Sequence, residues 1–188
     1  DFPGAMVPHV EDDTNICDTS YGFSKVVGEQ FTKWYAKQYG FTAKIARLFN
    51  VYGPGDSSKF PHVIPEFIQK ARICKDGQSY FPILGSGRQT RDFTWLGDVV
   101  DGLLMITHKG EHLQPYNIGT MRQTSIRELA ELICDIIGVS PVFTSEPVAK
   151  EDIQLRAADN TKLRALGWTP KVALKQGLEK MIAEPMLV

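Results

Sequence analysis

The stretch SYGFSKVVGEQFTKWYAKQYGFTAKIARLFNVYGPG, residues 20–55, carries the strongest indication of the fold. Over residues 20–38 its apolar side chains recur at helical spacing, a Thr-Ser pair offers an N-cap, and Gly40 offers a stop. The segment TAKIARLFNVYG, residues 42–53, is β-branched and aromatic and leads into a Gly-Pro-Gly turn, which predicts a buried strand. A helix followed by such a strand is half of an α/β repeat.

The remainder of the chain continues with helices and short strands in alternation. The apolar periodicity and the turn residues predict helices over residues 64–74, from about 98, over 124–138, 160–168 and 173–184, and strands at 80–85, 115–119 and 141–146. Thr124 or Ser125, with Glu128 as a capping-box partner, is expected to cap the helix over residues 124–138. Asp98 and Asp101 are expected to cap the helix that begins near residue 98 or to lie on its surface. The order of elements indicates the α/β fold class.

Bulk composition excludes several classes of protein. The 188 residues are 43% hydrophobic and 23% charged with a net charge of −1, which is typical of a soluble globular protein and lacks the basic excess of a nucleic-acid binder. The longest apolar runs fall short of the ~20 residues of a membrane span, and the acidic N-terminus does not resemble a signal peptide. Cys17, Cys74 and Cys134 have no metal-binding or redox spacing. We therefore expect a cytoplasmic setting and no metal, nucleic acid or membrane partner.

Tyr21 and Lys25 form the first candidate for chemistry. They lie four residues apart in the first turn of the predicted helix, so they share one face with Cβ atoms about 6 Å apart. A nearby ammonium favours a phenolate over a phenol, and the positive N-terminus of the helix adds to this effect. A tyrosine in that setting can take a proton from a sugar hydroxyl while hydride leaves the attached carbon. The alternative is that Tyr21 caps the helix and Lys25 is solvated.

Five motifs occur in order along the chain: SYGFSK, ARLFNVYGPGD, GSGRQTRDFTWLGDVVDGLL, YNIG and RAADNTKLRALGWTPK. This series resembles the extended short-chain dehydrogenase/reductase family, specifically its NAD-dependent sugar-nucleotide epimerases and dehydratases. The resemblance covers essentially the whole chain. It implies the C-terminal part of a Rossmann-type parallel-sheet domain with a smaller mixed α/β substrate-binding lobe.

The resemblance also implies a division of the chain. Residues 1–55 and 93–120 correspond to the Rossmann-type domain, and residues 56–92 and 121–188 to the substrate-binding lobe. The family's glycine fingerprint and its catalytic Ser or Thr precede the tyrosine helix, and neither is present in this sequence. We expect both to lie upstream of Asp1, and the 188 residues alone to be inactive.

Carried over residue by residue, the family's cofactor and catalytic roles fall on the first two motifs. Tyr21 would be the general base and acid, and Lys25 would hydrogen-bond the nicotinamide ribose of NAD. Phe49 would pack near the nicotinamide, and Asn50 would donate its amide to the substrate's diphosphate. The alternatives are an ordinary core phenylalanine and a turn-forming asparagine.

Substrate roles fall on the later motifs. Arg91 and Arg156 would pair with the diphosphate, because a guanidinium matches phosphate oxygens bidentately. Asp159 would accept from a ribose hydroxyl, and His62 and Val63 would line the nucleotide base. For each arginine the alternative is a surface salt bridge.

The function implied is oxidation of a nucleotide-bound sugar at C4 by NAD, followed by return of the hydride. The segment YNIGTMRQTSIRELAELI resembles UDP-glucose 4-epimerases. Other members of the family remain open: a dTDP- or GDP-sugar 4,6-dehydratase or a UDP-sugar decarboxylase. Outside it, a reductase of small carbonyl compounds or a non-catalytic module that binds a sugar nucleotide or a partner remains open. The resemblance further implies a homodimer in the complete protein, formed through the helix that carries Tyr21.

Overall fold

The computed structural model of the chain describes residues 9–11, 19–56, 62–75, 77, 79–147 and 157–183. This part contains six helices interspersed with eight strands. Their bounds are α1 Ser20–Tyr39, β1 Ile45–Leu48, β2 Val51–Tyr52, α2 Val63–Lys75, β3 Tyr80–Leu84, β4 Thr90–Arg91, β5 Thr94–Trp95, α3 Leu96–Lys109, β6 Pro115–Ile118, β7 Thr124–Ser125, α4 Ile126–Ile137, β8 Val142–Glu146, α5 Thr161–Ala165 and α6 Leu174–Ala183.

The strands pair two by two, and parallel pairing dominates. β1 pairs with β6, β2 with β5 and β3 with β8 in parallel, while β4 and β7 pair antiparallel. Parallel neighbours require a crossover, and here helices lie between the paired strands in the chain. The fold is therefore of the α/β class with Rossmann-type parallel pairing, as the sequence predicted.

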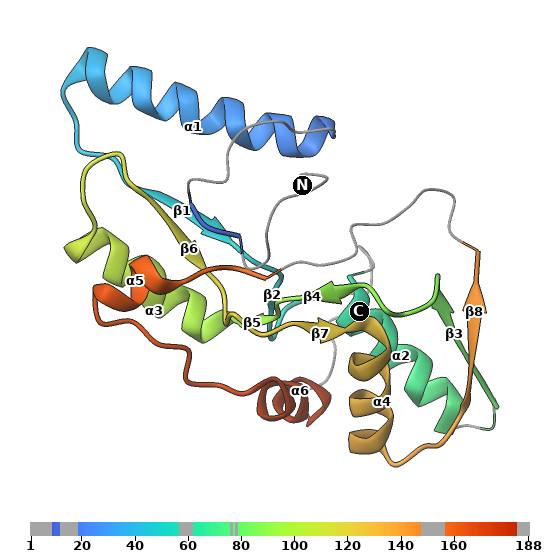
Figure 1. Cartoon of the computed structure of the whole chain (residues 1–188). Coiled ribbons are helices and arrows are strands. Elements are labelled where there is room, and N and C mark those ends of the chain that lie inside the picture. The colour runs from blue at the N-terminus through green and yellow to red at the C-terminus, as the bar shows by residue number, and fades with distance from the viewer. Residues whose placement is uncertain are drawn as a thin grey trace.

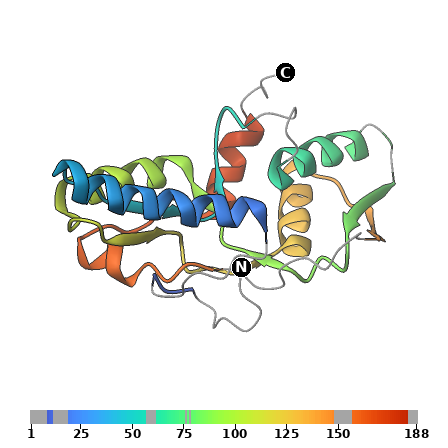
Figure 2. The same ribbon diagram turned by 90° about the horizontal axis from the view of Figure 1, so that it is seen from above.

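The elements gather into two groups that lie side by side in both views (Figures 1 and 2). One group holds α1, β1, β6, α3 and α5, and the other holds α2, α4, β3 and β8, with α6 between them. Within the first group, α1 and α3 cover opposite faces of the β1–β6 pair. Arg47 of β1 bonds to α1, whereas its neighbour Ala46 packs against the cluster formed with α3.

Each group has its own hydrophobic core. The larger cluster joins α2, α4, α6 and β3 through fully buried side chains, among them Ile68, Phe81, Leu129, Ile133 and Leu178. The smaller cluster joins α3, β6 and the α5 region through Val99, Ile106, Tyr116, Ile118, Leu163 and Trp168. Burial of one such large apolar side chain stabilises the folded state by about 1.5–3 kcal/mol. Each cluster therefore stabilises the group of elements to which it belongs.

Caps fix the ends of the two clearest helices as the sequence predicted. The Thr19 side chain accepts from the backbone N–H of Gly22 at the start of α1, and Gly40 ends that helix in the left-handed conformation. Ser125 and Glu128 form a reciprocal capping box at the start of α4. The hydrogen bonds between the Glu128 carboxylate and Ser125 lower the pKa of Glu128. In the described ranges no helix is long and apolar enough to cross a membrane.

Two predictions about elements were wrong in detail. The strand expected over residues 42–53 is interrupted between β1 and β2, because Asn50 adopts a positive φ of 25°. The helix expected from about residue 98 begins at Leu96, and Asp98 does not cap it. Asp98 is instead buried, only 2% exposed, and accepts from the backbone N–H of Val172. It ties α3 to the segment before α6.

Candidate functional site

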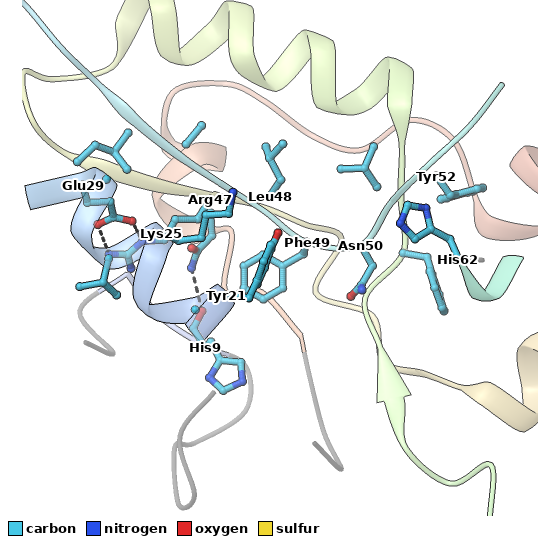
Figure 3. A pocket seen from close by; sticks show the side chains of 18 of the residues that line it. His9, Tyr21, Lys25, Glu29, Arg47, Leu48, Phe49, Asn50, Tyr52 and His62 are labelled. Carbon is cyan, nitrogen blue, oxygen red and sulfur yellow. Dashed lines mark hydrogen bonds and ion pairs between the residues drawn. The ribbon is translucent and has the colours of Figure 1, made fainter. Parts of the chain in front are cut away.

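A large pocket of about 1110 Å³ opens between α1 and the strand β1. Its lining combines the first turns of α1, all of β1, the bend between β1 and β2, and the start of α2. Figure 3 shows the labelled side chains in a row, from Glu29 and Lys25 through Tyr21, Phe49 and Asn50 to His62 and Tyr52. Six of the predicted site residues line this one pocket: Tyr21, Lys25, Phe49, Asn50, His62 and Val63.

Tyr21 and Lys25 present polar groups to the pocket from the first turns of α1. The Lys25 ammonium lies over the Tyr21 ring, 5.0 Å from its centroid. The tyrosine is 73% exposed, so its ring is not used to pack the core. A cation over the face of an aromatic ring is an attractive contact. The helix thus offers a phenol hydroxyl and an ammonium to the same ligand.

The bend at Phe49 and Asn50 forms the opposite wall. The Phe49 backbone N–H donates to the carbonyl of Ile118 at 3.0 Å, which extends the β1–β6 pairing by one residue. Asn50 then takes its positive φ, a conformation that costs a non-glycine residue about 1–3 kcal/mol. Its buried side-chain oxygen Oδ1 has no hydrogen-bond partner within the described part of the chain. An unpaired buried acceptor beside a pocket is a candidate ligand contact.

An ion pair that the sequence reasoning missed joins α1 to β1. The Arg47 guanidinium donates through Nε and Nη2 to the two carboxylate oxygens of Glu29, each at 2.8 Å, and its Nη1 donates to the Glu11 carbonyl at 2.7 Å. Glu29 lies four residues after Lys25, on the same face of the helix. The spacing places Glu29 on the pocket face, but no local signal in the sequence predicts its contact with Arg47, which lies 18 residues away.

His62 and Val63 lie at the start of α2, at the other end of the pocket. His62 Nδ1 is 2.8 Å from a carboxylate oxygen of Asp56, a residue that the sequence reasoning did not single out. The imidazole is largely exposed. Both residues line the pocket, and His62 lies beyond Asn50 in the row of labelled side chains (Figure 3).

Arg91 and Asp159 do not line this pocket. Arg91 is half-buried and donates through Nη1 to the carbonyl of Thr90 at 2.8 Å. Asp159 accepts from the backbone N–H of Thr161 at 2.8 Å, at the start of α5. Arg156 lies outside the described residues. The structure therefore separates the predicted residues into a pocket set and a second set around Arg91 and Asp159.

Metal-binding side chains do not gather in the ranges given above: no three His, Cys, Asp or Glu residues lie close enough together there to hold an ion. Two titratable groups have shifted pKa values: Tyr52 in the pocket lining and Cys134 in the larger core. Burial, with a smaller contribution from the charge of Asp98, raises the pKa of Tyr52. Burial also raises the pKa of the Cys134 thiol to about 11, so this thiol stays protonated at neutral pH.

Comparison with known proteins identifies the family of the chain. A family model described as GDP-mannose 4,6 dehydratase matches residues 5–181. UDP-glucuronic acid decarboxylase 4 of Arabidopsis thaliana is 33% identical over 165 residues, which are 87% of this chain and 36% of the relative.

Two solved structures share the fold. UDP-glucose 4-epimerase with UDP-glucose from Thermotoga maritima matches with a TM-score of 0.83 and 31% identity, over 95% of this chain and 57% of that chain. RMD of Pseudomonas aeruginosa complexed with NADPH matches with a TM-score of 0.87 and 26% identity, over 97% and 61%. The chain thus spans roughly a third to three fifths of these proteins. With nearly all of its length matched by the family model, the chain belongs to the GDP-mannose 4,6-dehydratase family, within the extended short-chain dehydrogenases/reductases.

Proposed function

We propose that the protein is an NAD-dependent sugar-nucleotide epimerase or dehydratase, and that its reaction is of the UDP-glucose 4-epimerase type. One observation carries the proposal: Tyr21 and Lys25 stand together at a large pocket whose opposite wall holds Phe49 and the unpaired Asn50 oxygen. The relatives named above support the substrate class, because two of them are named for UDP-sugars.

Tyr21 is the proton-transferring group of this proposal. As the phenolate, its oxygen takes the proton from the 4-hydroxyl of the sugar and returns it later, a role that requires the side chain to face the pocket. The Lys25 ammonium stabilises the phenolate and donates to the ribose of the cofactor. NAD, when bound, supplies the hydride acceptor for C4.

The pocket has room for the nicotinamide end of the cofactor. Pockets for small ligands are usually about 300–1,000 Å³, so 1110 Å³ accommodates a large ligand. Phe49 offers a flat apolar surface to a nicotinamide ring, and Asn50 Oδ1 offers an acceptor that now lacks a donor among the described residues. The NADPH complex of the Pseudomonas relative supports the class of cofactor.

The nucleotide part of the substrate is assigned to residues from both sets. Arg91, Arg156 and the amide nitrogen of Asn50 hold the diphosphate, Asp159 accepts from a ribose hydroxyl, and His62 and Val63 line the base. We retain the division into a Rossmann-type domain, residues 1–55 and 93–120, and a substrate lobe, residues 56–92 and 121–188. Helix α5 of the substrate lobe packs against β6 of the Rossmann-type domain.

A second copy of the chain is the proposed partner of α1. Phe31, Trp34 and Tyr35 form an exposed aromatic cluster on this helix, with ring centroids 6.1 and 6.4 Å apart, away from the pocket lining. Large aromatic side chains are enriched at protein interfaces. The three cysteines have no metal-binding or redox spacing, which supports a cytoplasmic setting for this homodimer.

Product identification tests the proposal. The full-length protein is incubated with UDP-glucose, dTDP-glucose, GDP-mannose and UDP-glucuronic acid, and the products are identified by NMR. We expect UDP-galactose from UDP-glucose. A 4-keto-6-deoxy sugar would assign the protein to the dehydratases. A pentose would assign it to the decarboxylases, the class for which the Arabidopsis relative is named. Binding of a sugar nucleotide without turnover of any of the four would contradict an enzymatic function.

A further inference from the structure

Asp92 follows Arg91 directly and is the most completely hydrogen-bonded buried carboxylate in the described structure. It is 0% exposed. Oδ1 accepts from the backbone N–H and the hydroxyl of Thr120, and Oδ2 accepts from the backbone N–H of Met121 at 3.1 Å and of Ala158 at 3.0 Å. Hydrogen bonds to a carboxylate are shorter and stronger than those between neutral groups. Asp92 is therefore strongly held by two other chain segments.

These segments meet in a close crossing, here called the Asp92 junction: Asp92, Gly119, Thr120, Met121 and Ala158. A Cβ atom at Gly119 would lie 2.4 Å from the Cβ of Ala158 and 2.8 Å from Oδ2 of Asp92, so only glycine fits. Met121 adopts a positive φ of 64°. A non-glycine residue keeps such a conformation when its surroundings hold it in place, and the bond to Asp92 does so.

The junction lies between the two sets of predicted site residues. Arg91 precedes it in the chain, and Asp159 follows Ala158. A Cβ atom at Gly119 would also lie 3.3 Å from the Cβ of Phe49, which is part of the pocket wall. The Phe49 N–H bonds to the residue before Gly119. One carboxylate thus fixes the backbone that carries Arg91 and Asp159 against the backbone that carries Phe49 and Asn50.

We propose that Asp92 is a positioning residue for nucleotide-sugar binding: its carboxylate sets the distance between the diphosphate-binding side chains and the pocket that holds the sugar. This inference rests on the proposed function, because it takes Arg91 and Asp159 as substrate contacts. Asp92 itself touches no substrate. It acts through the backbone of the Asp92 junction.

The variant Asp92→Asn isolates this role, because it keeps the volume of the side chain. An amide has one acceptor oxygen, and its NH₂ group donates. If the NH₂ group takes the place of Oδ1, it faces the two donors of Thr120, and both of those bonds are lost. If it takes the place of Oδ2, the bonds from Met121 and Ala158 are lost instead. Thr120→Val is a milder variant that removes the hydroxyl and keeps the backbone bond to Asp92.

The test measures KM and kcat for UDP-glucose, the Kd for UDP and the Tm in the full-length protein. For Asp92→Asn we expect KM and Kd to rise about tenfold or more with kcat within about twofold, the pattern of lost uniform binding. Thr120→Val should change KM and Kd in the same direction by less. The matched control is Asp98→Asn, which alters another buried carboxylate, one that accepts from the backbone N–H of Val172. It should lower the Tm without changing KM.

Arg91→Ala separates failure of this inference from failure of the proposed function. If Arg91→Ala weakens UDP binding while Asp92→Asn lowers only the Tm, Asp92 has a purely structural role. Equal rises of KM in Asp92→Asn and Asp98→Asn would likewise overturn the positioning role. If Arg91→Ala leaves KM and Kd unchanged, the proposed substrate site is wrong and the inference falls with it. Should Asp92→Asn fail to fold, an unchanged Kd in Thr120→Val contradicts the proposal.

Discussion

Helices α1 and α4 use their side chains in opposite ways. α1 has 20 residues, of which only Ala36 is buried, and it displays aromatic side chains on its surface. α4 has 12 residues and buries five of them in the larger core: Ile126, Leu129, Ala130, Ile133 and Cys134. Both helices are capped as the sequence predicted. The difference is that α4 is held by packing, whereas α1 is held to β1 by the ion pair between Glu29 and Arg47.

This difference suggests a division of labour. A helix whose side chains are buried in a core has few side chains available to bind a ligand. Accordingly, no residue of α4 lines the pocket. α1 contributes Tyr21, Lys25 and Glu29 to that lining. Substitutions on α4 should therefore change stability, and substitutions on the pocket face of α1 should change function.

The largest effect on stability is expected from Leu129→Ala. Leu129 is fully buried between α2 and α4, so the variant leaves a cavity and should lower the free energy of unfolding by about 2–5 kcal/mol. Phe23→Ala is the matched change on α1, where the ring is 61% exposed, and should alter it by about 0.5 kcal/mol or less. Urea unfolding of both variants measures the contrast. Similar losses in the two variants would contradict the difference between the helices.

A smaller effect is expected from Glu29→Gln, which weakens the attachment of α1. Only about a fifth of each side chain in the Glu29–Arg47 pair is exposed, and loss of the charge leaves Arg47 partly uncompensated. We expect kcat to fall about tenfold, or about 1.4 kcal/mol in activation free energy, because Tyr21 and Lys25 shift with the helix.

Glu131→Gln on α4 is the control for that change. Its pair with Arg127 is about half exposed on both sides, and such surface pairs contribute roughly 0–1 kcal/mol. We expect its kcat and its free energy of unfolding to stay near those of the wild type. A kcat for Glu29→Gln equal to that of Glu131→Gln would show that the Glu29–Arg47 pair does not position α1.

Local patterns in the sequence were sufficient for the helices and for most of the strands. Periodicity and caps identified α1 and α4 because these signals lie within one element. The break at Asn50 was missed, because a positive φ at a non-glycine residue depends on contacts with β5 and β6 that are distant in the sequence. Asp98 was assigned to a cap for the same reason, since its partner Val172 lies 74 residues away.

The candidate site shows the same limit. Tyr21 and Lys25 share a helix face, so their spacing alone predicted that they would meet. The pairing of Glu29 with Arg47 and the bonds of Asp92 join segments that only the tertiary fold brings together. Motifs taken from the family located Arg91 and Asp159, yet they gave no indication of the carboxylate that fixes both.

The most direct test of the proposed chemistry is the kcat of Tyr21→Phe in the full-length protein, measured with the sugar nucleotide that the wild type converts. We expect kcat to fall by about 10²–10⁴-fold, while the Kd of the sugar nucleotide and the Tm stay close to wild type. Tyr39→Phe, on the same helix and outside the pocket lining, should match the wild type. A near-normal kcat for Tyr21→Phe would contradict the central claim that this hydroxyl transfers the proton.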